Sequence, residues 1–227
     1  LPLSITDPLG ATTDISYKPS SAYQNTLMPY IIQTVSSIVR HDGRGAAYTT
    51  TYDYSAGLYD YTEREFRGFG YVEASQMRDA STYESKTETW FHQDFTRKGV
   101  PSAQLITSRE GHTRRVDNIW TAATLTGGVT YPRLDSTQST MTDAGYTPYT
   151  FASAYTYDST YLNVTDEHKT GMAPADETHT CYAYTNLTGP WIISKPTDIM
   201  ITDASGYIKS RKWMDYDGTT GNLLTEE

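Results

Sequence analysis

The sequence predicts an all-β, antiparallel fold with little helix, and three observations support this prediction. Tyrosine is unusually frequent, with 20 Tyr against 5 Phe and 4 Trp, and tyrosine suits a strand on which the ring packs while the hydroxyl stays in water. Side chains alternate with a period of two over several stretches, as they do in strands. Short turn sequences rich in Asp and Gly separate these stretches, which is typical of antiparallel sheets.

Five stretches carry the clearest alternation and are predicted as strands: 31–39, 48–54, 82–92, 178–185 and 207–216. In the second stretch Tyr48, Thr50, Tyr52 and Tyr54 share one face. In the third stretch one face carries Glu84, Lys86, Glu88, Trp90 and His92, and the opposite face carries Tyr83, Ser85, Thr87, Thr89 and Phe91. Because few of these stretches have one strongly aliphatic face, we expect a sheet that is wet on both sides rather than one layer of a sandwich.

Turn sequences lie at 42–45, 127–128, 143–145, 203–206 and 217–218. The segment 109–128 is the best candidate for a helix or a long connection. The polar, turn-rich segment 132–149 is predicted to be a loop or a boundary. With no clear linker elsewhere, residues 1–227 are expected to form a single β-rich domain. The chain begins at Leu1 without a Met, so we interpret it as a fragment of a larger protein.

Composition argues against several classes of function. The net charge is −9, charged residues make up 20% of the chain with both signs interspersed, and the absence of a basic stripe argues against binding to nucleic acid. No apolar run approaches the length of a membrane-spanning helix, so no direct membrane span is expected. Cys181 is the single cysteine, which excludes an internal disulfide and a thiolate zinc site.

The stretch YDYTEREFRGFGYVEA, residues 59–74, raises the question of catalysis. Glu63 and Glu65 are two positions apart, so on a strand both face the same way with Cβ atoms roughly 6 to 7 Å apart. Two carboxylates across a cleft could hydrolyse a glycoside. Arg64 and Arg67, however, would hold both carboxylates ionised. We therefore favour structural ion pairs over a general acid, and we rank a hydrolase last.

The same stretch contains the glycine pair of Gly68-Phe69-Gly70. A dinucleotide-binding loop would need a third glycine where Glu73 stands, followed by a helix rather than a strand. Glycine within a strand more often marks a bulge or a close approach of the backbone. Phe66 and Phe69 are then expected to anchor a bent strand, one on either side, and the segment is predicted to be structural.

A weak internal repeat consists of Tyr-Asp, a short spacer, Asn and an aliphatic residue. It occurs as YDSTYLNV, with Tyr157, Asp158 and Asn163, and as YDGTTGNLL, with Tyr216, Asp217, Gly221 and Asn222. In each unit Asp is expected to cap the turn by accepting hydrogen bonds from nearby backbone N–H groups. A shortened relative lies at 52–60. Such units must stack on neighbours to bury a face.

Other candidate sites are weaker. Asp166-Glu167-His168 is the nearest carboxylate–histidine cluster, and it is interpreted as a solvated loop rather than a metal site. Asp215, Asp217 and Thr219 partly match a calcium loop, but the required glycine is missing at its position, and an Asp-Gly turn explains the same residues. Cys181, on a predicted strand, is expected to be an inert thiol. We expect no catalytic residue, no metal and no cofactor.

Two stretches carry a family resemblance: VSSIVRHDGRG…TTTYDYSAGLYDYTEREFRGFGYVE and ETWFHQDFTRKGVP. They resemble the middle region of the B component of insecticidal Tc toxin complexes, and related SpvB and RHS-type proteins. The distinctive signature spans residues 52–70, and the Tyr-Asp units resemble RHS (YD) repeats. The signature residues are Tyr52, Tyr54, Gly57, Tyr59, Asp60, Arg64, Glu65, Phe66, Arg67, Gly68, Phe69 and Gly70. The first repeat departs from the pattern, because Leu162 precedes Asn163 where Gly is expected.

The resemblance implies a curved, extended sheet of RHS-type strands that forms part of a hollow shell in a secreted virulence factor. Such a shell encloses a toxic C-terminal polypeptide and helps to deliver it through a channel-forming subunit. The implied partners are the remaining shell of the parent protein, the enclosed toxin polypeptide and the channel-forming toxin subunit. An alternative is a secreted β-sandwich that binds carbohydrate through exposed Tyr and Trp. A coplanar exposed row among Trp90, Trp120, Trp191 and Trp213 would favour that alternative.

Overall fold

The structure is a computed structural model that describes residues 1–25, 27–125 and 127–227. Within this part the chain divides into two compact units. Unit 1 comprises residues 1–117 and 140–148, and unit 2 comprises residues 118–139 and 149–227. Strands β8 and β9 each contribute residues to both units.

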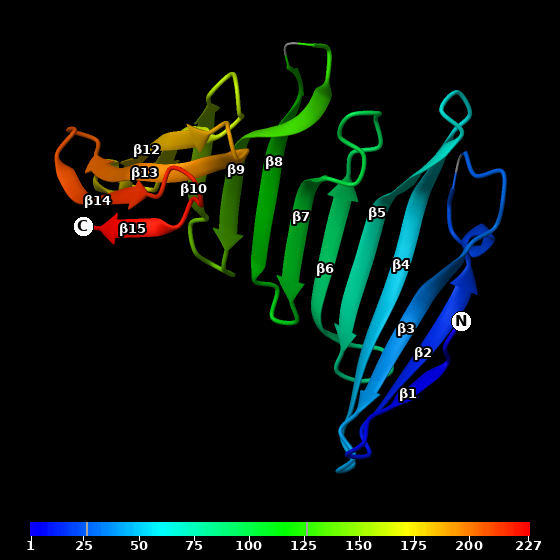
Figure 1. Cartoon of the computed structure of the whole chain (residues 1–227). Coiled ribbons are helices and arrows are strands. Elements are labelled where there is room, and N and C mark those ends of the chain that lie inside the picture. The colour runs from blue at the N-terminus through cyan, green and yellow to red at the C-terminus, as the bar shows by residue number, and fades with distance from the viewer. Residues whose placement is uncertain (26, 126) are drawn as a thin grey trace. The chain divides into compact units, whose positions relative to one another are not determined.

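Unit 1 is an open, twisted sheet whose strands pair in chain order from β1 to β8, and each pair is antiparallel (Figure 1). Its strands are β1 Ser4–Thr6, β2 Thr12–Pro19, β3 Gln33–His41, β4 Ala47–Asp60, β5 Glu65–Met77, β6 Tyr83–Phe91, β7 Pro101–Ser108 and the first half of β8 Thr113–Thr124. A short 3-10 helix, η1 Ser20–Ala22, begins the loop between β2 and β3.

Unit 2 is a second open sheet with the same sequential, antiparallel pairing. Its strands are the remainder of β8, most of β9 Thr130–Thr142, β10 Tyr149–Tyr157, β11 Val164–Thr170, β12 Thr178–Leu187, β13 Ile192–Asp203, β14 Ile208–Tyr216 and β15 Leu223–Glu226. The 3-10 helix η2 Pro174–Asp176 lies in the β11–β12 loop. Neither of these three-residue helices could cross a membrane, and the described chain has no other helix that could.

The predicted antiparallel, curved all-β fold with little helix is confirmed, and all five predicted strands are present. The predicted helix or long connection at 109–128 is wrong, because β8 occupies most of it; its many polar residues suit a strand exposed on both faces. For the segment 132–149, predicted to be a loop or a boundary, a loop is wrong for residues 132–142, which belong to β9, whereas residues 143–148 do form a connection between strands. The alternative of a boundary stays a prediction. The expectation of one domain stays a prediction.

Neither sheet has a conventional hydrophobic core. Among the described residues Ala103, 7% exposed, is the one fully buried apolar side chain, whereas several fully buried residues are polar. Most strand residues instead have intermediate exposure. Because each sheet is a single layer, side chains on either face are covered by their neighbours on adjacent strands and not by a second layer. An alternative fold, the β-sandwich, is therefore wrong for these units.

Polar ladders on the sheet show how a face without a core is stabilised. Glu73 on β5 pairs directly with Glu88 on β6. Lys86 lies between them, with Nζ 3.1 Å from a carboxylate oxygen of Glu88 and 3.7 Å from one of Glu73. The Tyr71 hydroxyl donates to both glutamates. The predicted shared face of Lys86, Glu88 and Trp90 is thus confirmed, since Trp90 pairs with Tyr71 across the same strands.

Aspartates close many of the hairpins by accepting backbone hydrogen bonds. Asp42 Oδ1 accepts from the N–H groups of Arg44 and Ala46 at 2.7 and 3.0 Å. Asp217 Oδ1 accepts from the N–H groups of Thr219 and Thr220 at 3.0 and 2.7 Å. Equivalent bonds are made by Asp7, Asp60, Asp79, Asp158 and Asp203. A carboxylate accepting two backbone N–H bonds is stabilised in its ionised form.

This arrangement predicts a loss of stability in acid. The N–H of Arg44 lowers the pKa of Asp42, and that of Thr220 lowers the pKa of Asp217, below the ordinary value of 3.8. A folded pKa below the unfolded one stabilises the fold at neutral pH, and this contribution is lost as pH falls through the folded value. We expect the melting temperature measured by circular dichroism to fall steeply between about pH 5 and pH 3.

Two variants test whether the capping aspartates cause this loss of stability in acid. Asp42→Asn should lower the melting temperature at neutral pH and make its decline in acid shallower. Asp53→Asn, in which the changed side chain lies within β4 and not at a turn, should leave the decline as it is. Identical pH profiles for Asp42→Asn and the parent protein would contradict this assignment.

Candidate functional site: the β4–β5 signature and the Tyr-Asp turns

The β4–β5 hairpin begins with a turn that Asp60 organises. Asp60 Oδ1 accepts hydrogen bonds from the N–H groups of Thr62 and Glu63 at 2.9 and 3.1 Å. Arg64 completes the turn in the left-handed region, with φ of 55°. Asp60 Oδ2 accepts from Arg67 Nη2 at 2.9 Å. The backbone N–H of Glu63 and then the Arg67 guanidinium lower the pKa of Asp60.

Arg67 is the charged residue around which the signature is organised. It is 4% exposed, and a buried charge is tolerated only when it is paired. Its two partners are Asp60 and Glu65, the latter with Oε2 3.2 Å from Arg67 Nη1. Lys98 Nζ lies 2.6 Å from Glu65. Its hydrogen bond is the largest cause of the lowered pKa of Glu65; partial burial opposes it, and charge–charge attraction to Lys98 and Arg67 lowers the pKa further.

The predicted ion pairing is confirmed for Glu65 and Arg67, although Lys98 was not foreseen. An ionised Glu65 fixed between two cations suits a structural role and is a poor general acid. Glu63 lies in the exposed turn, with its backbone N–H bound to Asp60. The two glutamates therefore do not share one strand face, as the sequence had suggested, because β5 begins at Glu65.

A β-bulge lies at the centre of the signature, as the glycines predicted. Gly57 pairs with Phe69 and Tyr59 pairs with Phe66, so β5 carries one residue more than β4 between these pairs. Gly68, with φ of +87°, lies in this bulge. The extra residue turns Phe66 and Phe69 to the same face, where their ring centroids are 5.7 Å apart. Their predicted placement on either side of the strand is therefore wrong.

The two phenylalanines belong to a continuous row of aromatic rings on this face, which we call the aromatic row. Successive centroids are 5.0 to 6.3 Å apart, and most of the pairs meet edge to face. Such contacts each add about 0.5–1.5 kcal/mol beyond the area that they bury. The row consists of Tyr23, Tyr54, Phe69, Phe66, Tyr30, Tyr59 and Tyr61.

Distant amides complete the backbone hydrogen bonds that the irregular strands leave open. Gln93 Nε2 donates to the carbonyl oxygens of Ala56 and Gly68, both at 2.8 Å. Asn25 Oδ1 accepts a hydrogen bond at 2.7 Å from the N–H of Gly57, which lies on β4. A Cβ at Gly57 would lie 2.7 Å from Asn25 Oδ1 and one at Gly70 2.8 Å from Gln93 Oε1, so both signature glycines permit a close approach.

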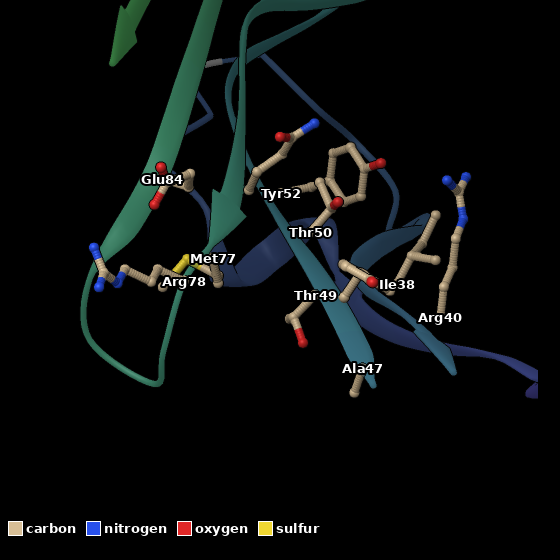
Figure 2. Close-up of a pocket in the computed structure, with 11 residues that line it drawn as sticks. Ile38, Arg40, Ala47, Thr49, Thr50, Tyr52, Met77, Arg78 and Glu84 are labelled. Atoms are coloured by element: carbon tan, nitrogen blue, oxygen red, sulfur yellow. The ribbon is translucent and has the colours of Figure 1, made fainter. Parts of the chain in front are cut away.

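The remaining signature tyrosine, Tyr52, lies within β4 opposite Ala74 and lines a groove of about 550 Å³. Figure 2 shows Arg78 and Glu84 on one side of this groove and Arg40 on the other, so the charged groups do not converge on one point. Glu84 instead faces Arg109, with Nε 3.6 Å from a carboxylate oxygen. The groove lacks the convergent polar groups of a small-molecule site.

The two Tyr-Asp repeats fold into the same turn, which we call the Tyr-Asp turn. In the first, the Asp158 N–H donates to the Asn163 carbonyl at 2.9 Å. In the second, the Asp217 N–H donates to the Asn222 carbonyl at the same distance. The residue before Asn has a positive φ in both, 62° at Leu162 and 68° at Gly221. The first repeat thus keeps the turn despite lacking glycine.

The tyrosines of the two turns pack beside a cation. Arg133 lies over the ring of Tyr157, whose hydroxyl donates to the Leu134 carbonyl at 2.7 Å. Lys195 Nζ lies 5.4 Å from the centroid of the Tyr216 ring. In the shortened relative at 52–60, the first Tyr-Asp lies within β4, and it is Asp60 at the end of the strand that caps a turn. The partial match of Asp215, Asp217 and Thr219 to a calcium loop is explained by the turn that Asp217 caps.

Two further predictions fall on β11 and β12. Asp166-Glu167-His168 is part of β11 and not a loop, because residues 166–169 pair with β12. Cys181 is a free thiol on β12. Burial and then the hydrogen bond to Asp166 raise the pKa of this thiol, which agrees with the predicted inert cysteine.

Two of the four tryptophans are covered by neighbouring side chains and so are poor stacking platforms for a sugar. In unit 1, Trp90 packs against Tyr71 with centroids 5.4 Å apart. In unit 2, Trp213 is 49% exposed, but the Arg211 guanidinium covers its ring at 3.8 Å. Trp191, 73% exposed, lies in the β12–β13 turn with φ of 55°.

Sequence reasoning missed Asn25, Gln93 and Lys98. Each contacts the signature from 25 to 37 positions away in the chain, so no local pattern could reveal the pairing. Gln93 and Lys98 lie within the second stretch that carries the family resemblance, and that stretch was the one available signal.

The comparisons with known proteins agree with this geometry. Residues 3–100 match the sequence profile of a family described as the insecticide toxin TcdB middle/N-terminal region. The sequence matches none of the curated proteins with which it was compared. In fold, the chain is similar to a chain of the TcdB2-TccC3-Cdc42 crystal structure, with a TM-score of 0.74 and 12% identity over 97% of this chain and 17% of that one.

Two further structures give the same result. TcdB2-TccC3 matches with a TM-score of 0.74 and 12% identity over 95% of this chain and 17% of that chain. The Tc holotoxin pore of Photorhabdus luminescens, in a mutant form, matches with a TM-score of 0.70 and 13% identity over 95% of this chain and 16% of that one. The chain therefore spans about a sixth of the length of the chains that it matches.

The chain is thus similar in sequence, over residues 3–100, to a family of insecticide toxin regions, and similar in fold, over nearly its full length, to chains of Tc toxin structures. The resemblance predicted from the sequence, to the middle region of the B component of Tc toxin complexes, is confirmed. The match in sequence covers residues 3–100, which include the whole signature. The match in fold covers nearly the full chain.

The second Tyr-Asp turn requires glycine at position 221 but not at position 218. Gly221 has φ of +68°, and a Cβ there would meet two atoms of Ile192 at 2.9 Å. Gly218 has an ordinary φ and open space around its Cβ position. Gly221→Ala should lower the free energy of unfolding by about 1–2 kcal/mol, whereas Gly218→Ala should leave it within about 0.5 kcal/mol. Urea unfolding measures both, and equal effects would refute the turn assignment.

The aromatic row predicts a second difference. Phe69→Ala removes ring contacts to both Tyr54 and Phe66 and should lower the free energy of unfolding by about 2 kcal/mol, less than for a fully buried Phe because the side chain is half-buried. Phe151→Ala, at a strand position that is 40% exposed, serves as the control and should cost less than half as much. An unchanged thermal melt for Phe69→Ala would contradict the role of the row.

Proposed function

We propose that this chain is a structural segment of the wall of an RHS-type toxin shell. The shell encloses a toxic C-terminal polypeptide and helps to deliver it. The observation that carries the proposal is the single-layer sheet: one fully buried apolar side chain among the described residues, with half-exposed side chains on both faces. A wall between an enclosed chamber and the solvent has two wet faces, whereas a sandwich or a barrel with a packed interior has one.

The second support is the arrangement of the turns. Aspartate caps give each hairpin a fixed end without help from a core, so successive hairpins can be added side by side. The similarity to TcdB2-TccC3 and to a holotoxin pore supports a place in a multi-component toxin. The proposed partners are the remaining shell of a longer protein, the enclosed polypeptide and a channel-forming subunit. The assembly is proposed to be secreted, and this segment to have no catalytic role.

Adjacent residues of one strand test the wall directly. Tyr182 and Ala183 on β12 pair with consecutive residues of β13 without a register shift between them, so their side chains point to opposite faces. A photo-crosslinking amino acid would be placed at each position in the longer toxin protein, produced together with its toxic polypeptide. We expect crosslinks to that polypeptide from one of the two positions only.

At the other position, a cysteine substitution should react with a bulky water-soluble thiol reagent. Cys181 is replaced by Ser in every variant so that it does not react. Crosslinks from both faces, or from neither face when the polypeptide is present, would refute the wall. The same variants produced without the toxic polypeptide are the control for crosslinks within the shell.

A further inference from the structure

A cluster of two histidines and carboxylates lies on one face of the β11–β12 hairpin, in unit 2. His168 on β11 is directly opposite His179 on β12, and Asp166 is opposite Cys181. Directly opposite residues of an antiparallel pair point to the same face. The two imidazole rings are stacked, with centroids 4.2 Å apart and an angle of 5° between their planes.

Each imidazole also has a carboxylate partner. Glu177 Oε1 lies 2.8 Å from His168 Nε2. Both carboxylate oxygens of Asp166 lie 3.3 Å from His179 Nδ1. A metal-ligating histidine usually has its second ring nitrogen bound to a carboxylate or a carbonyl. Asp166 supplies that contact to His179 and leaves Nε2 of His179 free to bind a cation.

We propose that His168, His179 and Glu177 form a binding site for a divalent transition metal of the Zn²⁺ class. One ligand atom from each of the three residues lies within 4.8 Å of the others. Zinc binds histidine nitrogen at about 2.0–2.1 Å and carboxylate oxygen at about 2.0–2.2 Å, so small side-chain rotations bring the three atoms around one ion. Two His and one Glu leave the fourth position of a tetrahedral site open to water or to a further ligand.

The loop between the two strands places the third ligand. A Cβ on Gly171 would lie 2.4 Å from Asp176 Cβ, so glycine is needed there for the loop to close. The Asp176 carboxylate accepts from the N–H of Ala173 at 3.0 Å, and the N–H of Glu177 donates to the Pro174 carbonyl at 3.3 Å. These bonds fix the backbone of Glu177 next to the histidine pair.

The site is accessible to an ion. The side chains of His168, Glu177 and His179 are 33%, 34% and 37% exposed. On the neighbouring strands the residues directly opposite the two histidines are small, Ala154 beside His168 and Thr202 beside His179. Neither of these residues has a large side chain that could cover the histidine pair. A bound ion would join β11, β12 and their loop, in a sheet that has no packed core to hold this hairpin.

Metal titration of the purified, chelator-treated protein tests the proposal. We expect isothermal titration with Zn²⁺ to give one site per chain, and Co²⁺ to give the visible absorption of a four- or five-coordinate ion. His179→Ala and Glu177→Gln should each weaken Zn²⁺ binding by at least about tenfold, and Asp166→Asn by about 10- to 100-fold through its effect on His179. At one Zn²⁺ concentration the melting temperature of the parent protein should rise more than that of Glu177→Gln.

His112→Ala is the matched control, because His112 Nδ1 also faces a carboxylate, 3.0 Å from Asp143, but lies in unit 1. It should bind Zn²⁺ as the parent does. Absence of a stoichiometric site in the parent protein would overturn the proposal. So would an equal loss of affinity in His112→Ala and His179→Ala, which would indicate surface binding only. Circular dichroism of each variant establishes that it is folded before titration.

Discussion

The hydrogen-bonded ladder between neighbouring strands is the interaction on which the whole structure depends. In most domains the ladder is supported by a core, but here Ala103 is the one fully buried apolar side chain among the described residues. Each strand is therefore supported by the strands beside it and by side chains that meet across them. That constraint explains the abundance of tyrosine and threonine, which cover a half-exposed sheet without needing a second layer. It also explains why the ends of hairpins carry so many fixed aspartates, since a strand pair without a core gains most from a turn that is already ordered.

The β4–β5 signature shows how strong local contacts are added to such a sheet. The bulge at Gly68 brings two phenylalanines to one face and completes the aromatic row, while Arg67 on the opposite face is neutralised by Asp60 and Glu65. The cost of burying a guanidinium is offset only because both carboxylates are present and Lys98 balances the second of them. Residues that look reactive in the sequence are thus explained by the electrostatics of one buried cation.

The strands and turns could be predicted because their signals are local. Side-chain alternation with a period of two and Asp-Gly turns can be recognised within a few residues. These two signals located β3, β4, β6, β12 and β14 correctly. Segments in which these local signals are weak or misleading were predicted wrongly. Residues 113–124 lack a clean alternation, and Asp166-Glu167-His168 is charged enough to look like a loop, yet in a sheet with two wet faces charged residues are normal inside strands. Contacts between distant residues, such as that between Gln93 and Ala56, depend on the register of the strands and could not be predicted from local sequence.

A sheet with two wet faces differs from a packed domain in what it can carry. On a sandwich, half of the strand positions are committed to the core, so a polar cluster can be built only on the outer face or in loops. Here both faces are open to polar chemistry, and cross-strand neighbours stand at regular spacings that the register fixes. The stacked His168 and His179, each with its own carboxylate, and the Lys86 ladder between Glu73 and Glu88 are two products of that geometry. The same absence of a core on which the proposed wall role rests therefore also leaves both faces of each sheet able to hold clusters of polar side chains.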